Sequence, residues 1–208
     1  MNWLLLKNSL FVSGLTTLLA VSLGFVTALW LLALEARSRN WFLALAVMAL
    51  LLPPFLVTNC WLHFLGHTGV WRSWLPIDIF SLGGSVWILT LLTWPITLLI
   101  IWSAWTQLES SQLESDSAVT GWTLISAILW PIGRPALAQA AVLTFVLALN
   151  NFAVPAILQT KVFPDEVWIR FNTTFDTLGA IKLSWPLILV PLAMLVLFAR
   201  SSIFRYIT

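Results

Sequence analysis

The segment LWPIGRPAL (Leu129–Leu137) is the stretch of this sequence that says most about its fold. A polar stretch (106–134) ends in it, and a long apolar run (135–158) begins in it. A run of that length can cross about 30 Å of hydrocarbon as an α-helix. We therefore interpret the segment as a surface connection that leads into a membrane helix.

The composition of the whole chain points to a lipid bilayer as its surroundings. Hydrophobic residues make up 60% of the 208 positions, charged residues make up 9%, and the mean hydropathy is +0.96. A soluble domain carries about 25% charged residues, so this set could not form a water-facing surface. The net charge of +2 is too small and too scattered to indicate nucleic acid as a partner.

Five apolar runs have the length of a membrane span, and none of them contains Asp, Glu, Lys or Arg. They are Leu10–Leu34, Trp41–Phe64, Ser81–Trp105, Pro135–Leu158 and Leu183–Ala199. Each such charge near a helix centre would cost about 2.5 to 3.5 kcal/mol on insertion scales. We therefore expect one all-α membrane domain (1–208) with five transmembrane helices.

Prolines predict where these spans bend, and tryptophans predict where they end. Pro53-Pro54, Pro95 and Pro155 predict kinks, because proline removes a backbone N–H and membrane helices tolerate it where neighbours satisfy the freed carbonyl. Trp105 is one of several tryptophans near span ends, where an indole N–H can stay in contact with water.

The charges leave the orientation of the helices open. Arg37 and Arg39 follow the first span and Lys7 precedes it, which favours an outside N-terminus. Over the whole chain, however, the ten Lys and Arg residues divide evenly between the two sides.

Two polar connections are long enough to carry structure of their own, 106–134 and 159–182. The first contains acidic residues, then Gly121 and a run with helical apolar periodicity that ends at Pro131. This pattern predicts a short amphipathic helix near the membrane surface.

Five features follow one another along essentially the whole chain: Asn8-Ser9-Leu10 with Gly24 in the first span, Leu51-Leu52-Pro53-Pro54-Phe55, Pro95 in the third span, Trp130–Leu137, and Leu149–Ala156. In this order they resemble the permease subunit of a type I ABC importer. The resemblance implies a bacterial inner-membrane protein with a short cytoplasmic coupling helix. It also implies three partners: an ABC ATPase, an extracytoplasmic substrate-binding protein, and a second permease subunit or a second copy of the chain.

The coupling loop of this family, called the EAA loop, has a degenerate counterpart here. Gly121 precedes Pro131 by ten positions, fewer than in the family pattern, and counting back from Pro131 puts Ala118 at the glycine position. Glu114, Asp116, Ala118, Gly121 and Pro131 are the candidate coupling residues. Three interpretations stay open: a divergent working permease, a subunit whose partner makes the better ATPase contact, and a permease-like scaffold that transports nothing.

A closer likeness is to iron(III)-, thiamine- and related permeases. It rests on Phe152-Ala153-Val154-Pro155-Ala156 and on the following run Val167–Asp176. In the family, a binding protein docks on the outer side, and Asp165, Glu166, Arg170 and Asp176 of the 159–182 connection offer polar contacts or are simply solvated.

The sequence gives no sign of an enzyme or of a cofactor. It has no G-x-x-x-x-G-K-[ST] loop for ATP, so the energy would come from a partner subunit. A membrane hydrolase or lipid transferase is disfavoured, because neither G-x-S-x-G nor H-E-x-x-H occurs. We expect no catalytic residues.

Asn150 and Asn151 are the candidate pathway residues, because amides inside an apolar span need hydrogen-bond partners or a water-filled cavity. Hydrogen bonding between helices is the alternative interpretation.

His63 and His67 stand four positions apart but lack a third metal ligand nearby. We therefore expect both to pack in the interface region and to form no metal site.

Overall fold

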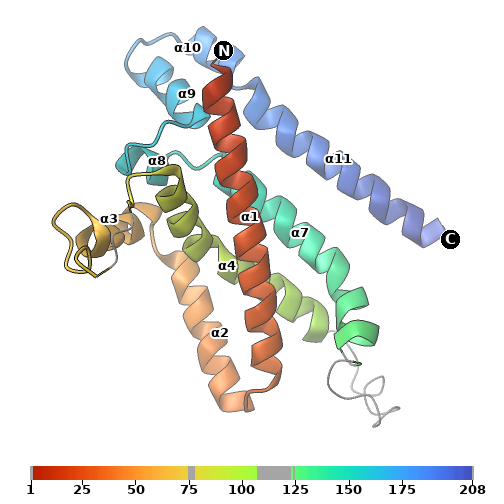
Figure 1. The fold of residues 1–208 in the computed structure, drawn as a ribbon. Helices are drawn as coiled ribbons and strands as arrows, with labels where there is room; N and C mark the ends of the chain where they lie inside the picture. Colours follow the sequence, from red (N-terminus) through yellow and green to blue (C-terminus); the bar gives the residue numbers. More distant parts are fainter. Residues whose placement is uncertain (1, 75–77, 107–122, 124, 208) are drawn as a thin grey trace.

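A computed structural model describes residues 2–74, 78–106, 123 and 125–207, and every regular element in these ranges is a helix. Figure 1 shows their arrangement. The elements are α1 (Trp3–Leu32), α2 (Ala36–Leu51), α3 (Pro54–Leu65), α4 (Leu82–Thr106), the π-helix η1 (Ile125–Leu129), α7 (Trp130–Leu149), α8 (Ala153–Ile157), α9 (Phe163–Asn172), α10 (Thr177–Leu183) and α11 (Trp185–Ile207). The expected all-α fold is confirmed.

Four of the described segments are long and apolar enough to cross a membrane. They are Trp3–Leu32, Leu82–Thr106, Ile125–Leu149 and Thr177–Val196. The pair Ala36–Leu51 and Pro54–Leu65 makes a fifth span if it is counted as one. The chain is therefore a multi-pass membrane protein with four to five candidate spans.

The core of the bundle is formed by α1, α4 and α7, which pack closely along small residues. A Cβ atom on Gly24 of α1 would lie 2.5 Å from the Cβ of Thr97 and 2.9 Å from the backbone nitrogen of Leu98, both on α4. Ala20 and Ala28 on α1 and Ala140 on α7 are fully buried. In lipid, helices gain little from the hydrophobic effect, so close backbone approach and van der Waals contact hold them together.

The second predicted span contains a sharp break instead of a mild kink. The axes of α2 and α3 differ by 98°, and the break falls at Pro53-Pro54. Leu52 is extended (φ −70°, ψ 126°), as is typical of a residue before proline, and Pro54 occupies the first turn of α3. As a result, α3 turns away from the direction of α2 (Figure 1).

The predicted fourth span, 135–158, is wrong at both ends. Helical structure begins at Ile125 and α7 ends at Leu149. Pro155 therefore lies in the short helix α8, beyond the span, and kinks no membrane helix. Pro95 is inside α4, where the prolyl nitrogen cannot donate to the carbonyl of Leu91.

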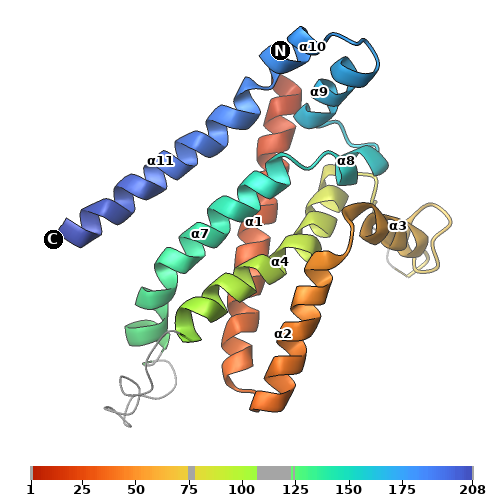
Figure 2. The ribbon, with the colours of Figure 1, turned by 180° about the vertical axis from the view of Figure 1, so that it is seen from behind.

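The last helix stands apart from the bundle. Viewed from either side, α11 starts beside the N-terminus and runs obliquely away from α1 (Figures 1 and 2). Its principal contacts are with α7 and α10. Ile188, Leu189, Leu192, Leu195 and Val196 leave about half or more of their surface exposed.

Candidate coupling and pathway site

The end of α4 is joined to the start of α7 by a buried hydrogen bond. The indole N–H of Trp105 donates to the carbonyl oxygen of Leu129 at 3.1 Å. Trp105 is 5% exposed and Leu129 is 4% exposed. The expectation that this indole N–H faces water is therefore wrong, because a backbone carbonyl takes the place of water.

Two further residues fix this junction. A Cβ atom on Gly133 would lie 3.3 Å from Nε1 of Trp105, so a side chain there would require the indole or α7 to shift by a few tenths of an ångström. From α1, the Phe25 ring packs edge-on against Trp105 at 6.0 Å and against Trp130 at 5.7 Å between centroids. Trp105, Leu129 and Gly133, together with Phe25, thus link all three core helices, and we call this set the Trp105 joint.

The π-helix η1 leads directly into this joint. It covers Ile125–Leu129 and continues into α7 without a break in the span Ile125–Leu149. π-helical turns are rare and are frequently found at functional sites. A displacement of the chain before Ile125 would reach the Trp105 joint through this turn.

Of the candidate coupling residues, the structure places Pro131 only. Pro131 is exposed in the first turn of α7, and the guanidinium of Arg134 lies 5.4 Å from the Trp130 ring centroid, a cation–π contact. Glu114, Asp116, Ala118 and Gly121 lie outside the described residues. Their contribution to a coupling helix remains a prediction.

An open groove of about 540 Å³ lies between α4 and α7 near the Trp105 joint. Most of its lining is apolar, but Ser103 of α4 and Gln139 of α7 also line it. Gln139 is exposed near the middle of the span Ile125–Leu149. An amide facing lipid at that depth would be costly, so this face of α7 needs water or a polar partner.

Asn150 and Asn151 lie at the end of α7 and stabilise helix ends. The side-chain amide of Asn150 donates to the carbonyl of Val146 at 2.9 Å. The Asn151 side-chain oxygen accepts from the backbone N–H of Val154 at 3.1 Å, in the first turn of α8. Gln139 is not among the predicted pathway residues, although it too is an amide within an apolar run.

At the opposite end of the bundle, side-chain hydrogen bonds hold the segment between α8 and α9 in place. Ser9 Oγ of α1 accepts from the backbone N–H of Phe163 at 2.8 Å. The Asn8 amide donates to the Lys161 carbonyl at 3.0 Å. The hydroxyls of Ser85 (α4) and Thr160 are 2.8 Å apart and hydrogen bonded. We call this set the N-terminal clamp.

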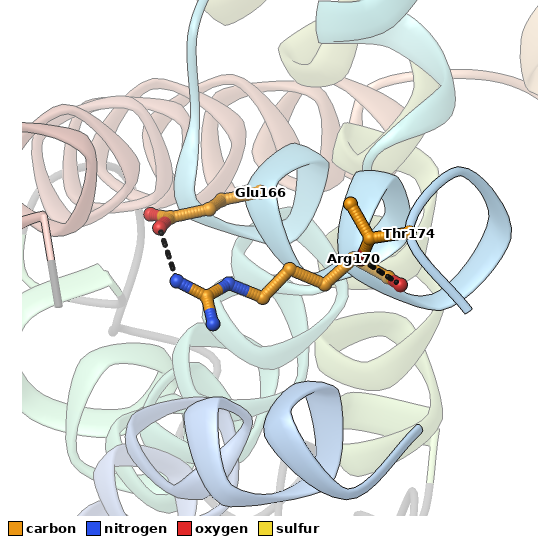
Figure 3. A network of polar contacts seen from close by, with 3 residues as sticks. All are labelled: Glu166, Arg170 and Thr174. Atoms are coloured by element: carbon orange, nitrogen blue, oxygen red, sulfur yellow. Dashed lines mark hydrogen bonds and ion pairs between the residues drawn. The ribbon is translucent and has the colours of Figure 1, made fainter. Parts of the chain in front are cut away.

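Beyond the clamp, α9 carries the charges expected to face a partner. Arg170 Nη2 and Glu166 Oε1 are 3.8 Å apart, and the Thr174 hydroxyl donates to the Arg170 carbonyl at 2.8 Å (Figure 3). Asp165 lies in the first turn of the same helix, where a carboxylate is favoured by the helix dipole. Asp176 caps α10 by accepting from the backbone N–H of Gly179 at 2.9 Å.

The two histidines pack against aromatic rings. His67 lies parallel to Phe80, with centroids 4.6 Å apart, and His63 packs against Phe64 at 5.7 Å. Within the described part of the chain, no group of three or more His, Cys, Asp or Glu residues could hold a metal ion.

Comparison with known proteins relates this arrangement to ABC transporters. No protein-family model matches the sequence. A protein of Haloferax volcanii named as a probable molybdenum ABC transporter permease is 26% identical over 173 residues, which cover 80% of this chain and 64% of that protein. The chain thus spans slightly less than two thirds of the length of this relative.

Solved structures of ABC transporters share the fold. A bacterial transporter involved in import of the acidic polysaccharide alginate has a TM-score of 0.76 at 17% identity, covering 98% of this chain and 79% of that one. An alginate transporter in complex with an alginate pentasaccharide-bound periplasmic protein gives 0.73 at 16%, covering 95% and 77%. The inward-facing MetNI methionine transporter gives 0.73 at 16%, covering 100% of both chains.

These likenesses agree with the resemblance drawn from the sequence at a coarse level. The chain has the fold of ABC importer permeases and is similar in sequence to one ABC transporter permease. The closer likeness to iron(III)- and thiamine-type permeases stays a prediction.

Proposed function

We propose that this chain is the permease subunit of an ABC importer in a bacterial inner membrane, working with a separate ABC ATPase and a second permease core. The observation that carries the proposal is the Trp105 joint. It joins Trp105, which precedes the connection that corresponds to the coupling loop, to Leu129 and Gly133, with which that connection enters α7, and Phe25 of α1 packs against Trp105. The likeness in fold to MetNI and to the alginate transporters supports the same assignment.

In this mechanism, the ATPase pushes on the segment that contains Glu114, Asp116, Ala118 and Gly121. The push passes through η1 to Pro131 and the Trp105 joint, and α7 then moves together with the end of α4. Binding energy at the ATPase thus shifts the membrane helices between inward-open and outward-open states. The chain hydrolyses nothing itself.

The solute would pass along the groove between α4 and α7, facing the second permease core. Ser103 and Gln139 would supply neutral polar contacts there. Asn150 and Asn151, at the far end of α7, would lie at the mouth of the same route. An extracytoplasmic binding protein would dock near α9 and α10, where Asp165, Glu166, Arg170 and Asp176 are found.

Two observations point to different solutes. The motif likeness of Phe152–Ala156 indicates iron(III) or thiamine, whereas the relative in Haloferax volcanii is named for molybdenum. Uptake assays with iron(III), thiamine and molybdate, each with its binding protein, would separate them.

Copurification tests the ATPase assignment. We expect the chain to retain an ABC ATPase in mild detergent, and Glu114→Lys combined with Gly121→Leu to reduce this retention severalfold. Glu35→Lys is the matched control, because Glu35 is an exposed acidic residue in the connection between α1 and α2, outside the connection 106–134. If the unaltered chain retains no ATPase, the proposal fails.

Thiol labelling tests the route. In a Cys60→Ser background, which removes the single cysteine, Gln139→Cys should react with a water-soluble thiol reagent in the assembled transporter. Leu18→Cys, exposed on α1 at a membrane depth, should stay unreactive. Equal reactivity of the two cysteines would contradict the assigned route.

The degenerate coupling signature favours a second candidate function, a permease-like scaffold that keeps the fold without transport. Ala118 stands where the family pattern has glycine. A scaffold would show no solute-dependent ATP hydrolysis after reconstitution with the ATPase, whereas a divergent permease would show it.

A further inference from the structure

A pocket of about 500 Å³ lies away from the proposed transport route, between α3, the connection that follows it, and the start of α4. Three indole rings line it, from Trp61 on α3, Trp71 in the connection and Trp87 on α4. We call it the tryptophan pocket. Neither the coupling mechanism nor the solute route uses it.

The three indole rings are held in place by contacts with other aromatic rings. Trp61 and Trp87 meet edge to face, with centroids 5.7 Å apart and planes at 86°. One face of Trp71 stacks on Phe64 at 4.6 Å, which fixes the ring. Trp71 and Trp87 nevertheless remain 44% and 49% exposed. The pocket is therefore lined by three indole rings, two of which keep nearly half of their surface exposed.

Asp78 is among the residues that line the same pocket. Asp78 is exposed, and its Oδ1 accepts from the backbone N–H of Phe80 at 3.0 Å, which orients the side chain. Ser81 fixes the turn by donating to the Asp78 carbonyl at 2.7 Å and accepting from the backbone N–H of Gly84 at 3.2 Å. No Lys, Arg or His of the described residues lies within ion-pair distance of Asp78.

The backbone at the start of α4 forms part of the pocket lining. Gly83 and Gly84 both line the pocket, and a side chain at Gly84 would overlap the carbonyl of Ile79. The pocket therefore combines aromatic faces, bare backbone and one negative charge.

This combination selects for a cation with an apolar surface. The faces of indole rings carry partial negative charge and attract a cation within about 6 Å, and the attraction is strongest for Trp. An ammonium with N–H groups would lose hydrogen bonds to water among these rings, whereas an alkylated ammonium has none to lose. We propose that the tryptophan pocket binds a quaternary ammonium group, with Trp61, Trp71 and Trp87 as the cage and Asp78 as the counter-charge.

The first test measures choline binding to the purified full chain in phosphatidylglycerol nanodiscs by calorimetry. We expect saturable binding, with 3,3-dimethylbutan-1-ol, the uncharged molecule of the same shape, at least about tenfold weaker. Equal binding of the two compounds, or no binding of choline, would overturn the proposal. The assay needs neither ATPase nor binding protein, so its outcome is independent of the proposed transport function.

Variants locate the site. Trp87→Leu should weaken choline binding about tenfold, Trp87→Phe should restore part of it, and Asp78→Asn should weaken it about threefold. The matched controls are Trp74→Leu, an 86% exposed ring in the same connection that does not line the pocket, and Asp165→Asn on α9. Unchanged binding in the folded Asp78→Asn and Trp87→Leu variants would contradict the assignment.

A second nanodisc composition identifies the source of the ammonium group. If a lipid headgroup is the natural occupant, phosphatidylcholine in the nanodisc should compete with free choline and raise its apparent Kd. If a free solute is the occupant, the apparent Kd should be the same in both lipids. Both results support the quaternary ammonium site and separate its two sources.

Discussion

The two ends of the bundle are held together in different ways. At the N-terminal clamp, Ser9, Asn8 and Ser85 each form a hydrogen bond to the segment 160–163, far away in the sequence. At the Trp105 joint, one buried side-chain hydrogen bond links α4 to the start of α7. The other contacts there are ring packing between Phe25 and Trp105 and the close approach of Gly133 to the indole.

This difference indicates where the molecule moves. Hydrogen bonds in a low-dielectric interior are directional and are costly to separate without water. Van der Waals contacts between rings have no comparable directional requirement. We therefore infer that the three hydrogen bonds of the clamp hold the segment 160–163 rigidly on α1 and α4. At the Trp105 joint, the hydrogen bond keeps the end of α4 with the start of α7, and the pair can move past α1, which meets them through ring packing.

The largest effect is expected from Gly24→Val, which would disturb both ends at once. The added Cβ would overlap Thr97 and the backbone of Leu98, so α1 and α4 would have to separate. We expect a loss of about 3 kcal/mol or more, seen as a lower Tm in detergent. Gly14→Val is the control, because nothing lies within 4 Å of its added Cβ, and equal losses in the two variants would contradict the close crossing.

Trp105→Phe tests the joint alone. The ring is kept and the N–H is lost, so the buried Leu129 carbonyl has no donor. We expect a loss of about 1 to 3 kcal/mol, with faster amide exchange confined to the start of α7. Trp130→Phe should change little, because Trp130 is 39% exposed. Faster exchange around Phe163 as well would show that the two ends are not independent.

Ser9→Ala tests the clamp and should have a smaller effect. The backbone N–H of Phe163 loses its acceptor, but the neighbouring bond between Asn8 and Lys161 is kept. We expect a loss of about 1 kcal/mol and faster exchange of the Phe163 amide. Ser22→Ala, at an exposed position of the same helix, is the control. An unchanged Phe163 amide would contradict the clamp.

Much of the fold could be predicted from the sequence, because hydrophobic runs and prolines act locally. The apolar runs place the helices, and Pro53-Pro54 marks the break between α2 and α3. The angle of 98° could not be predicted, since it depends on how α3 packs against α8 and α4.

The candidate site was harder to predict, because its residues are defined by what they contact. Asn150 and Asn151 looked like amides inside a span, but α7 ends at Leu149 and both side chains satisfy helix ends. Gln139, which does lie within a span and lines a groove, has no sequence signal beyond its polarity. Trp105 looked interfacial until the structure brought Leu129 to its N–H.

The smallest effect is expected from Glu166→Gln on α9, at the same end of the bundle as the clamp. The Arg170 and Glu166 side chains are 42% and 22% exposed and 3.8 Å apart, so solvent screens their attraction. We expect a change in stability below about 0.5 kcal/mol. Asp176→Ala, which removes the cap on the Gly179 N–H, should cost about 1 kcal/mol. If thermal unfolding instead shows the larger loss for Glu166→Gln, charge pairing would outweigh directed hydrogen bonds in this region, and the rigidity assigned to the clamp would lose its physical basis.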